Sequence, residues 1–267
     1  MKHILMLLAV LIPSVLFSEE LHKITPNETL HKKSLYPTIK IISGTDAIGT
    51  GCILRSEKNN NYFKDQYLNV AITANHVIKE NQFLVHVPKY KNWSEIDGFS
   101  EYQGTVHSIN KEKDLAIILF VSPNKLETAE LDLDSELFLG TELFKIGYGL
   151  GDDIRLDFGC VTSVKTINPP MLKNFVRINA YTIFGDSGGP VFYKNSYKII
   201  GITNAIRGIQ GSMLFSQSYI SPISGLKDWN KSLNNGIKFV FDDKTEIPLT
   251  STYQLWLKDY NITGNRK

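Results

Sequence analysis

Short runs of β-forming residues, each closed by a turn signal, are the feature of this sequence that most restricts its fold. They recur from residue 36 to residue 221, separated by Gly, Asn, Asp and Pro. The clearest runs are TIKIIS (38–43), GCILRS (51–56), LNVAIT (68–73), QFLVHV (82–87), LAIILFV (115–121), ELFKIGY (142–148), FVRINAY (175–181), YKIIGIT (197–203) and MLFSQSYI (213–220). Helical periodicity is scarce before residues 224–235, which predict a short helix. The pattern is typical of an all-β barrel or sandwich.

Composition and charge exclude several other classes of protein. Hydrophobic residues make up 42% of the chain and charged residues 21%, which is ordinary globular usage and excludes wholesale disorder. The formal charge of +2 gives no indication of a nucleic-acid partner. Neither Cys nor His residues occur at the spacing of a zinc site. We therefore expect a globular domain with no metal and no cofactor.

The first eighteen residues have the layout of a secretory signal peptide. Lys2 is followed by an apolar stretch over residues 4–17 and by the small Ser18. A membrane span needs about 20 apolar residues, and Pro13 further weakens that alternative. We expect a secreted or periplasmic protein without stable membrane insertion after cleavage, although an uncleaved anchor or a buried first helix stays open. Residues 19–35 are polar and predict a linker.

The two cysteines of the chain could form a disulfide in an exported protein. Cys52 and Cys160 both lie in apolar, strand-like settings. These settings favour two separate thiols that pack as small hydrophobic residues.

The segment GDSGGP at residues 185–190 is the strongest candidate for a chemical site. Its glycines permit a tight backbone path in which successive N–H groups near Ser187 can point at one developing oxyanion. The segment also satisfies the G-x-S-x-G elbow of α/β-hydrolases, whose catalytic histidine follows the serine in the chain. That alternative fails, because all six histidines precede Ser187.

Two further segments could complete a triad in the order His, Asp, Ser. TANHV places His76 just after the apolar strand LNVAI, and KEKDLAIILF places Asp114 at the start of the next apolar strand. His86 and His107 fit strands better than a site. Asp97 and Asp132 could compete with Asp114 for the place in the triad, but neither precedes an apolar strand in this manner.

With these motifs in the same order, the chain resembles the trypsin/chymotrypsin-like serine peptidases, above all the compact bacterial HtrA-like proteins, here without a PDZ domain. The similarity runs from about residue 37 to 223 and rests on GTG (49–51), TANHV (73–77), KEKDLAI (111–117), LGTELFKIGYGLG (139–151), FGCVTSV (158–164) and FGDSGGPVF (184–192). It implies an all-β fold of two six-stranded antiparallel barrels, over about 36–124 and 125–221, with a short C-terminal helix.

The resemblance also implies a role for each site residue. Ser187 would be the nucleophile, His76 the general base and acid, and Asp114 the residue that orients the imidazole. The backbone N–H groups of Gly185 and Ser187 would form the oxyanion hole.

Asp186 raises the question of activation. In relatives made as zymogens, the aspartate before the nucleophile pairs with a new N-terminus, and a cut before Ile41 could supply one here. Because PTIKIISG (37–44) fits a continuous first strand, we expect instead that Asp186 finds an internal cation or backbone donors. HtrA-like proteins usually carry Asn at this position, so the chain departs from that branch.

The residues that would line the primary specificity pocket predict cleavage after a small or medium apolar side chain. Tyr181 stands where trypsin-like enzymes keep an Asp, so a preference for Lys or Arg is unsupported, and no histidine is available for a glutamate-specific pocket. The strand that pairs with substrate is expected at ITNAI (202–206). The candidate pocket residues are Tyr181, Thr182, Thr203, Ala205 and Ile206.

The resulting prediction is an exported serine endopeptidase that acts on protein or peptide substrates as a monomer. The domain would span residues 36–236, followed by a C-terminal extension at 237–267. A catalytically silent binding protein of the same fold, and a self-processing or esterase-like enzyme, remain the alternatives.

Overall fold

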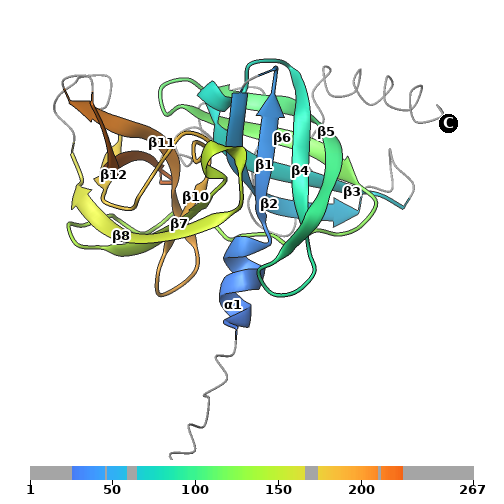
Figure 1. Cartoon of the computed structure of the whole chain (residues 1–267), viewed down its shortest axis with the longest axis horizontal. Helices are drawn as coiled ribbons and strands as arrows, with labels where there is room; N and C mark the ends of the chain where they lie inside the picture. The colour runs from blue at the N-terminus through green and yellow to red at the C-terminus, as the bar shows by residue number, and fades with distance from the viewer. Residues whose placement is uncertain (1–25, 46, 59–64, 166–173, 210–211, 225–267) are drawn as a thin grey trace, which may run out of the picture.

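The protein folds into two antiparallel β-barrels that lie side by side, as the computed structural model shows (Figure 1). The structure describes residues 26–45, 47–58, 65–165, 174–209 and 212–224. Barrel 1 consists of β1 (Thr38–Ser43), β2 (Ala47–Lys58), β3 (Tyr67–Ala74), β4 (Gln82–Tyr90), β5 (Ile96–Asn110) and β6 (Leu115–Ser122). Barrel 2 consists of β7 (Glu142–Gly147), β8 (Arg155–Ser163), β9 (Val176–Ile178), β10 (Pro190–Tyr193), β11 (Ile199–Ile209) and β12 (Ser212–Pro222).

Both barrels close with the same strand order. In barrel 1 the neighbours run β1-β2-β3-β6-β5-β4, and barrel 2 repeats this order from β7 as β7-β8-β9-β12-β11-β10. The predicted all-β fold of two six-stranded barrels is therefore confirmed. The helix expected at 224–235 and the signal peptide and extension fall almost entirely outside the described residues.

Three apolar clusters explain why the strands pack in this way. One cluster fills barrel 1 around Ile118 and Phe120, and another fills barrel 2 around Ile178 and Val191. The third lies between the barrels and joins Leu119 of β6 to residues of barrel 2 such as Phe192. The two barrels thus share one core at their junction.

A short helix precedes barrel 1, where the sequence predicted only a linker. α1 (Glu28–Leu30) continues into η1 (His31–Leu35), and Asn27 caps the helix by accepting a hydrogen bond from the Leu30 N–H (3.0 Å). Leu35 is buried in the cluster between the barrels. The linker prediction is therefore wrong for residues 28–35. In the described part of the chain, no helix is long and apolar enough to cross a membrane.

Cys52 and Cys160 are both free thiols, as the sequence favoured. Cys52 is buried on β2 in barrel 1, whereas Cys160 is half-buried on β8 in barrel 2.

Candidate active site

The pairing of β3 with β6 brings His76 and Asp114 together. Ala74 pairs with Leu115 at the end of this ladder, so the residues just outside it face each other. His76 lies in η2 (Asn75–Val77), and its Nδ1 is 2.6 Å from Oδ2 of Asp114. The His76 backbone N–H donates to the other carboxylate oxygen at 2.9 Å. An Nδ1–H that donates to a carboxylate leaves Nε2 as the free acceptor of the ring.

A third residue, Asn204, connects this pair to Ser187. The Asn204 side chain donates through Nδ2 to Oδ2 of Asp114 (2.5 Å), while its backbone carbonyl accepts a hydrogen bond from the Ser187 hydroxyl (3.3 Å). In the described structure, the Ser187 hydroxyl thus donates to Asn204 rather than to His76. The structure places His76, Asp114 and Ser187 in one hydrogen-bonded group.

Asn204 is not recognisable from the sequence, because its position depends on an irregularity in the sheet. The register between β11 and β12 shifts between Thr203 and Ala205, which marks a β-bulge at Asn204. Such a bulge re-aims a side chain relative to the regular alternation of a strand. A bulge of this kind leaves no recognisable pattern in ITNAI.

The loop that carries Ser187 has its carbonyl groups held by hydrogen bonds. The donors come from the loop itself, from β2 and from the turn η3 (Gly149–Gly151). These bonds are Asp186 N to Ile183 O (3.1 Å), Leu150 N to Phe184 O (2.5 Å), Thr50 Oγ1 to Gly185 O (2.8 Å), Gly189 N to Asp186 O (2.9 Å) and Thr50 N to Ser187 O (2.8 Å). The backbone N–H groups of Gly185 and Ser187 have no acceptor among the described residues. Two backbone donors of the loop that carries Ser187 are therefore unused.

Gly185 is required for this loop conformation. Its φ is +96°, and the Asp186 N–H bonds back to Ile183 O, as in a type II turn with glycine at its third position. A Cβ at Gly185 would lie 2.3 Å from the carbonyl oxygen of Tyr148. Any side chain here would therefore push the turn away from its present position.

A family model for the trypsin-like peptidase domain matches residues 49–202 of the chain. The chain belongs to this family. The matched span includes His76, Asp114 and Ser187, and it ends on β11 just before Asn204. No curated protein matches the chain.

Two further histidines of this trypsin-like peptidase lie on strands of barrel 1. His86 on β4 is 3.4 Å from a carboxylate oxygen of Glu101, and burial lowers its pKa. Burial lowers the pKa of His107 on β5 to about 4. Both are strand residues, as their sequence settings indicated. Asp132, the alternative to Asp114, caps a turn by accepting the Ser135 N–H at 2.9 Å.

The predicted pocket residues lie on the segment before Ser187 and on β11. The Tyr181 ring is 44% exposed, and it packs against Phe215, with ring centroids 5.9 Å apart. Thr182 is buried, and its N–H donates to Phe215 O at 2.7 Å. The guanidinium of Arg155 lies 5.3 Å from the centroid of the Tyr181 ring. A positive charge thus stands beside the residue that replaces the trypsin-like Asp.

The other three pocket candidates lie on β11, on either side of the bulge at Asn204. Thr203 is buried, whereas Ala205 and Ile206 are half-buried and pair with β12. β10 pairs with β11 only as far as Ile202. Thr203 still bonds through its N–H and its carbonyl to Gly189 and Gly188 (2.8 Å each). Beyond Thr203, β12 is the strand partner of β11 in the described structure, so the opposite edge can accept an extended peptide.

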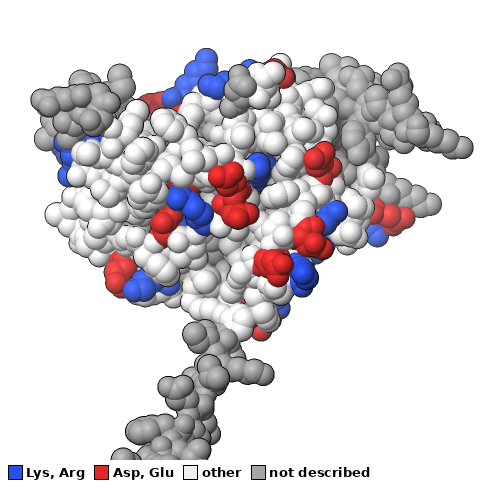
Figure 2. Space-filling view, viewed as in Figure 1, with Lys and Arg blue, Asp and Glu red and all other residues white. Residues whose placement is uncertain are grey.

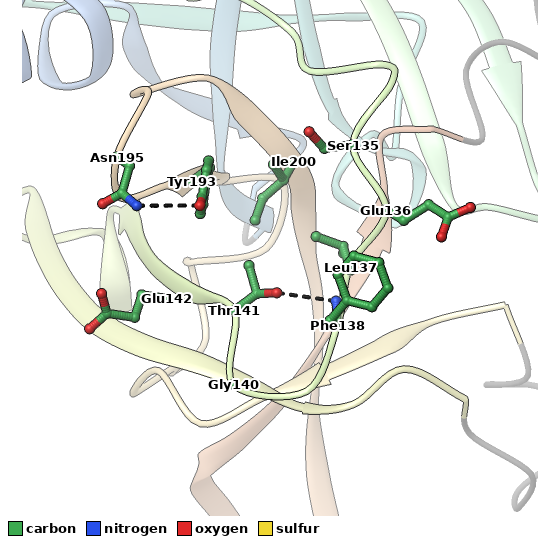
Figure 3. Close-up of a pocket in the computed structure, with 10 residues that line it drawn as sticks. All are labelled: Ser135, Glu136, Leu137, Phe138, Gly140, Thr141, Glu142, Tyr193, Asn195 and Ile200. Atoms are coloured by element: carbon green, nitrogen blue, oxygen red, sulfur yellow. Dashed lines mark hydrogen bonds between the residues drawn. The ribbon is translucent and has the colours of Figure 1, made fainter.

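A separate groove on barrel 2 does not share the residues of this site. Figure 3 shows its lining, which comes from the segment 135–142, from β10 and the turn that follows it, and from Ile200 on β11. The groove has a volume of about 450 Å³, but it contains no histidine beside its hydroxyl groups. The described residues also include no group of three or more His, Cys, Asp or Glu that could hold a metal ion.

Proposed function

We propose that this chain is a serine endopeptidase that uses Ser187, His76 and Asp114. The observation that carries the proposal is the hydrogen-bonded group of these residues beside two unused backbone N–H donors. A metal or cofactor is not needed for this chemistry, because the base, the nucleophile and the oxyanion donors all come from the chain.

The reaction begins when Ser187 Oγ attacks the carbonyl carbon of the scissile peptide bond. His76 Nε2 takes the hydroxyl proton, so the hydroxyl must first turn from Asn204 toward the imidazole, which a free hydroxyl rotor allows. In substrate-free sites such catalytic hydrogen bonds are often long and tighten on binding. Asp114 keeps the proton on Nδ1 and stabilises the imidazolium that forms.

The negative charge of the tetrahedral intermediate develops on the former carbonyl oxygen. The N–H groups of Gly185 and Ser187 would bind that oxygen, and loss of one such donor typically lowers turnover by about 10²–10³. His76 then gives its proton to the leaving amine, and an acyl group remains on Ser187. Water attacks this ester by the same route and frees the enzyme.

We propose that the substrate lies along the open edge of β11 and places a small or medium apolar side chain next to Tyr181. Tyr181 supports this preference, because its ring packs beside Arg155 and offers no carboxylate with which a Lys or Arg side chain could pair. The HtrA-like character of the chain, its monomeric state and its export remain predictions. Figure 2 shows a mostly uncharged face on which acidic and basic side chains are scattered and intermixed.

The proposal is tested by intact-mass spectrometry of the full chain after exposure to a fluorophosphonate, which phosphonylates an activated serine with loss of fluoride. We expect one adduct on the wild type and none on Ser187→Ala. A protein that lacks the adduct in both forms would contradict the proposal and favour a silent binding protein. The unmodified mass of the exported protein also reports its N-terminus, which we expect at Glu19.

A further inference from the structure

Asp186 is a charged residue that the hydrolytic chemistry does not use and that the fold buries completely. It lies in the loop between Gly185 and Ser187, with none of its surface exposed. A buried carboxylate is costly unless cations or hydrogen-bond donors surround it. The partners of Asp186 therefore decide whether this loop can keep its conformation.

Two cations of barrel 2 supply the compensation. Lys145 Nζ lies 2.7 Å from Asp186 Oδ2, and an Arg155 guanidinium nitrogen lies 3.0 Å from the same oxygen. The Lys145 side chain has no exposed surface, whereas that of Arg155 is 31% exposed. Asp157 approaches both cations at 3.6 Å, so two positive and two negative groups balance.

The strand register explains how these residues converge. Lys145 on β7 pairs with Asp157 on β8, and Gly147 pairs with Arg155. A Cβ on Gly147 would lie 2.6 Å from Oδ1 of Asp186, so only glycine leaves room for the carboxylate there. The β7–β8 ladder thus brings two cations to Oδ2 of Asp186 and leaves room for Oδ1.

The carboxylate in turn fixes the turn before Ser187. The Ile183 N–H donates to Asp186 Oδ2 at 2.9 Å, while the Asp186 N–H donates to Ile183 O at 3.1 Å. These two bonds close the turn from Ile183 to Asp186, within which Gly185 lies. The Asp186 side chain therefore holds the turn from which the Gly185 N–H projects, together with the Leu150 N–H that bonds to the Phe184 carbonyl of the same peptide group.

A newly formed N-terminus at Ile41 has no place in this arrangement. Ile41 is buried in the middle of β1, where it pairs with Gly49 on one side and Val85 on the other. A cut between Lys40 and Ile41 would break a strand in the wall of barrel 1. It would not add a cation to Asp186, which already has two.

We propose that Lys145 is a positioning residue of the hydrolytic site: its buried ammonium holds Asp186, and thereby the Gly185 and Ser187 N–H donors, so that the chain is active without cleavage before Ile41. This inference rests on the proposed function. It extends that function by assigning the activated state to a side chain of the barrel rather than to a processing step.

The test compares the rate at which a fluorophosphonate labels Ser187 in the full-length mature chain and in its Lys145→Met variant. Methionine keeps an unbranched side chain only one atom shorter than lysine, but it removes the charge. We expect Lys145→Met to become labelled at least about 100-fold more slowly, the loss expected when an oxyanion donor is misplaced. The final labelled fraction should remain close to that of the wild type, because a positioning defect slows the reaction and does not remove folded sites.

Two further variants separate positioning from general damage. Lys194→Met removes an exposed lysine of the same barrel and should leave the rate unchanged. Lys145→Arg keeps the cation and should recover much of the rate, even if Lys145→Met proves too unstable to measure. The inference would be overturned if Lys145→Met became labelled at a rate within about twofold of wild type. It would also be overturned if Lys145→Arg folded normally but became labelled at least about 100-fold more slowly than wild type, the loss expected for Lys145→Met.

The outcome for the uncut wild type keeps the two proposals distinct. Labelling that appears only after a cut before Ile41 would overturn the positioning role and leave the serine endopeptidase proposal standing. Absence of labelling before and after such a cut would contradict the proposed function itself, and the inference with it.

Discussion

Asp114 illustrates how single residues of this site are held from several directions. Its carboxylate accepts hydrogen bonds from the ring and the backbone N–H of His76 and from the Asn204 side chain. Its own φ is +49°, a left-handed conformation that short polar residues adopt more readily than most. Asp114 is thus fixed by its own turn, by His76 and by the Asn204 side chain of β11.

Asn204 should contribute to turnover through Asp114. A hydrogen bond to a charged group is worth about 1.5–3 kcal/mol, so Asn204→Ala should lower kcat/KM by about 10- to 100-fold. The effect should fall mainly on kcat, because the variant loses only the side-chain bond to Asp114. It keeps the backbone carbonyl that accepts the Ser187 hydroxyl. Asn195→Ala, which alters an exposed asparagine of the same barrel, is the control. An unchanged kcat/KM in Asn204→Ala would exclude this role.

His107 should make stability depend on pH in the mildly acidic range. Burial lowers its pKa from 6.5 to about 4, so between these values the unfolded chain binds a proton that the folded chain does not. The free energy of unfolding should therefore fall as the pH falls from 6.5 to 4, by on the order of 3 kcal/mol in total. Urea unfolding at several pH values tests this effect, and His107→Gln should show a shallower slope. Equal slopes would show that another group titrates.

At the level of elements, β6 shows which parts of the fold the sequence could predict. All eight of its residues are buried, because one face fills barrel 1 and the other faces the cluster between the barrels. The continuous apolar run LAIILFV therefore predicted the strand. Of β5, only the segment around His107 was predicted as a strand, since the sequence IDGFSEYQGTVHSIN is largely polar and half-exposed.

Similar reasons explain which parts of the site could be predicted. His76, Asp114 and Ser187 lie at strand ends and in a glycine turn, where local sequence carries the signal. Asn204 and Lys145 could not be assigned their contacts, because these depend on a bulge and on the register of β7 with β8. The sequence predicted an internal cation for Asp186, but it could not say which of the basic residues of the chain would supply it.

The burial of both faces of β6 leads to a prediction about stability. Leu119→Ala should lower the free energy of unfolding by about 2–5 kcal/mol, because it opens a cavity between the barrels that neighbouring strands cannot fill. Ile109→Ala on the exposed side of β5 should change it by less than about 0.5 kcal/mol. Urea denaturation measures both, and similar losses in the two variants would contradict the packing described here.

For the whole molecule, the shared core predicts that the two barrels unfold together. The cluster between them contains residues from β2, β3 and β6 of barrel 1 and from β7, β10 and β11 of barrel 2. Separating the barrels would expose this apolar surface to water. Hydrogen exchange in increasing urea should give one common transition for strand amides of both barrels. Two transitions at distinct urea concentrations would show that the barrels are independent.

The placement of the site at this junction links the fold to the proposed chemistry. His76 and Asp114 come from barrel 1, whereas Ser187 and Asn204 come from barrel 2. The groups that would transfer the proton are thus held near one another only while both barrels keep their common core. Activity should therefore be lost at the same urea concentration as the strand protection.

The most direct test of the account is the hydrolysis of peptide bonds in an unfolded protein substrate, with the fragments sequenced by mass spectrometry. We expect the purified mature chain to cut after small or medium apolar residues, and Ser187→Ala to produce no fragments. Cleavage that persists in Ser187→Ala would contradict the assignment of the nucleophile. A wild type that takes up the fluorophosphonate but cuts no peptide bond would contradict the endopeptidase function and favour an esterase-like enzyme.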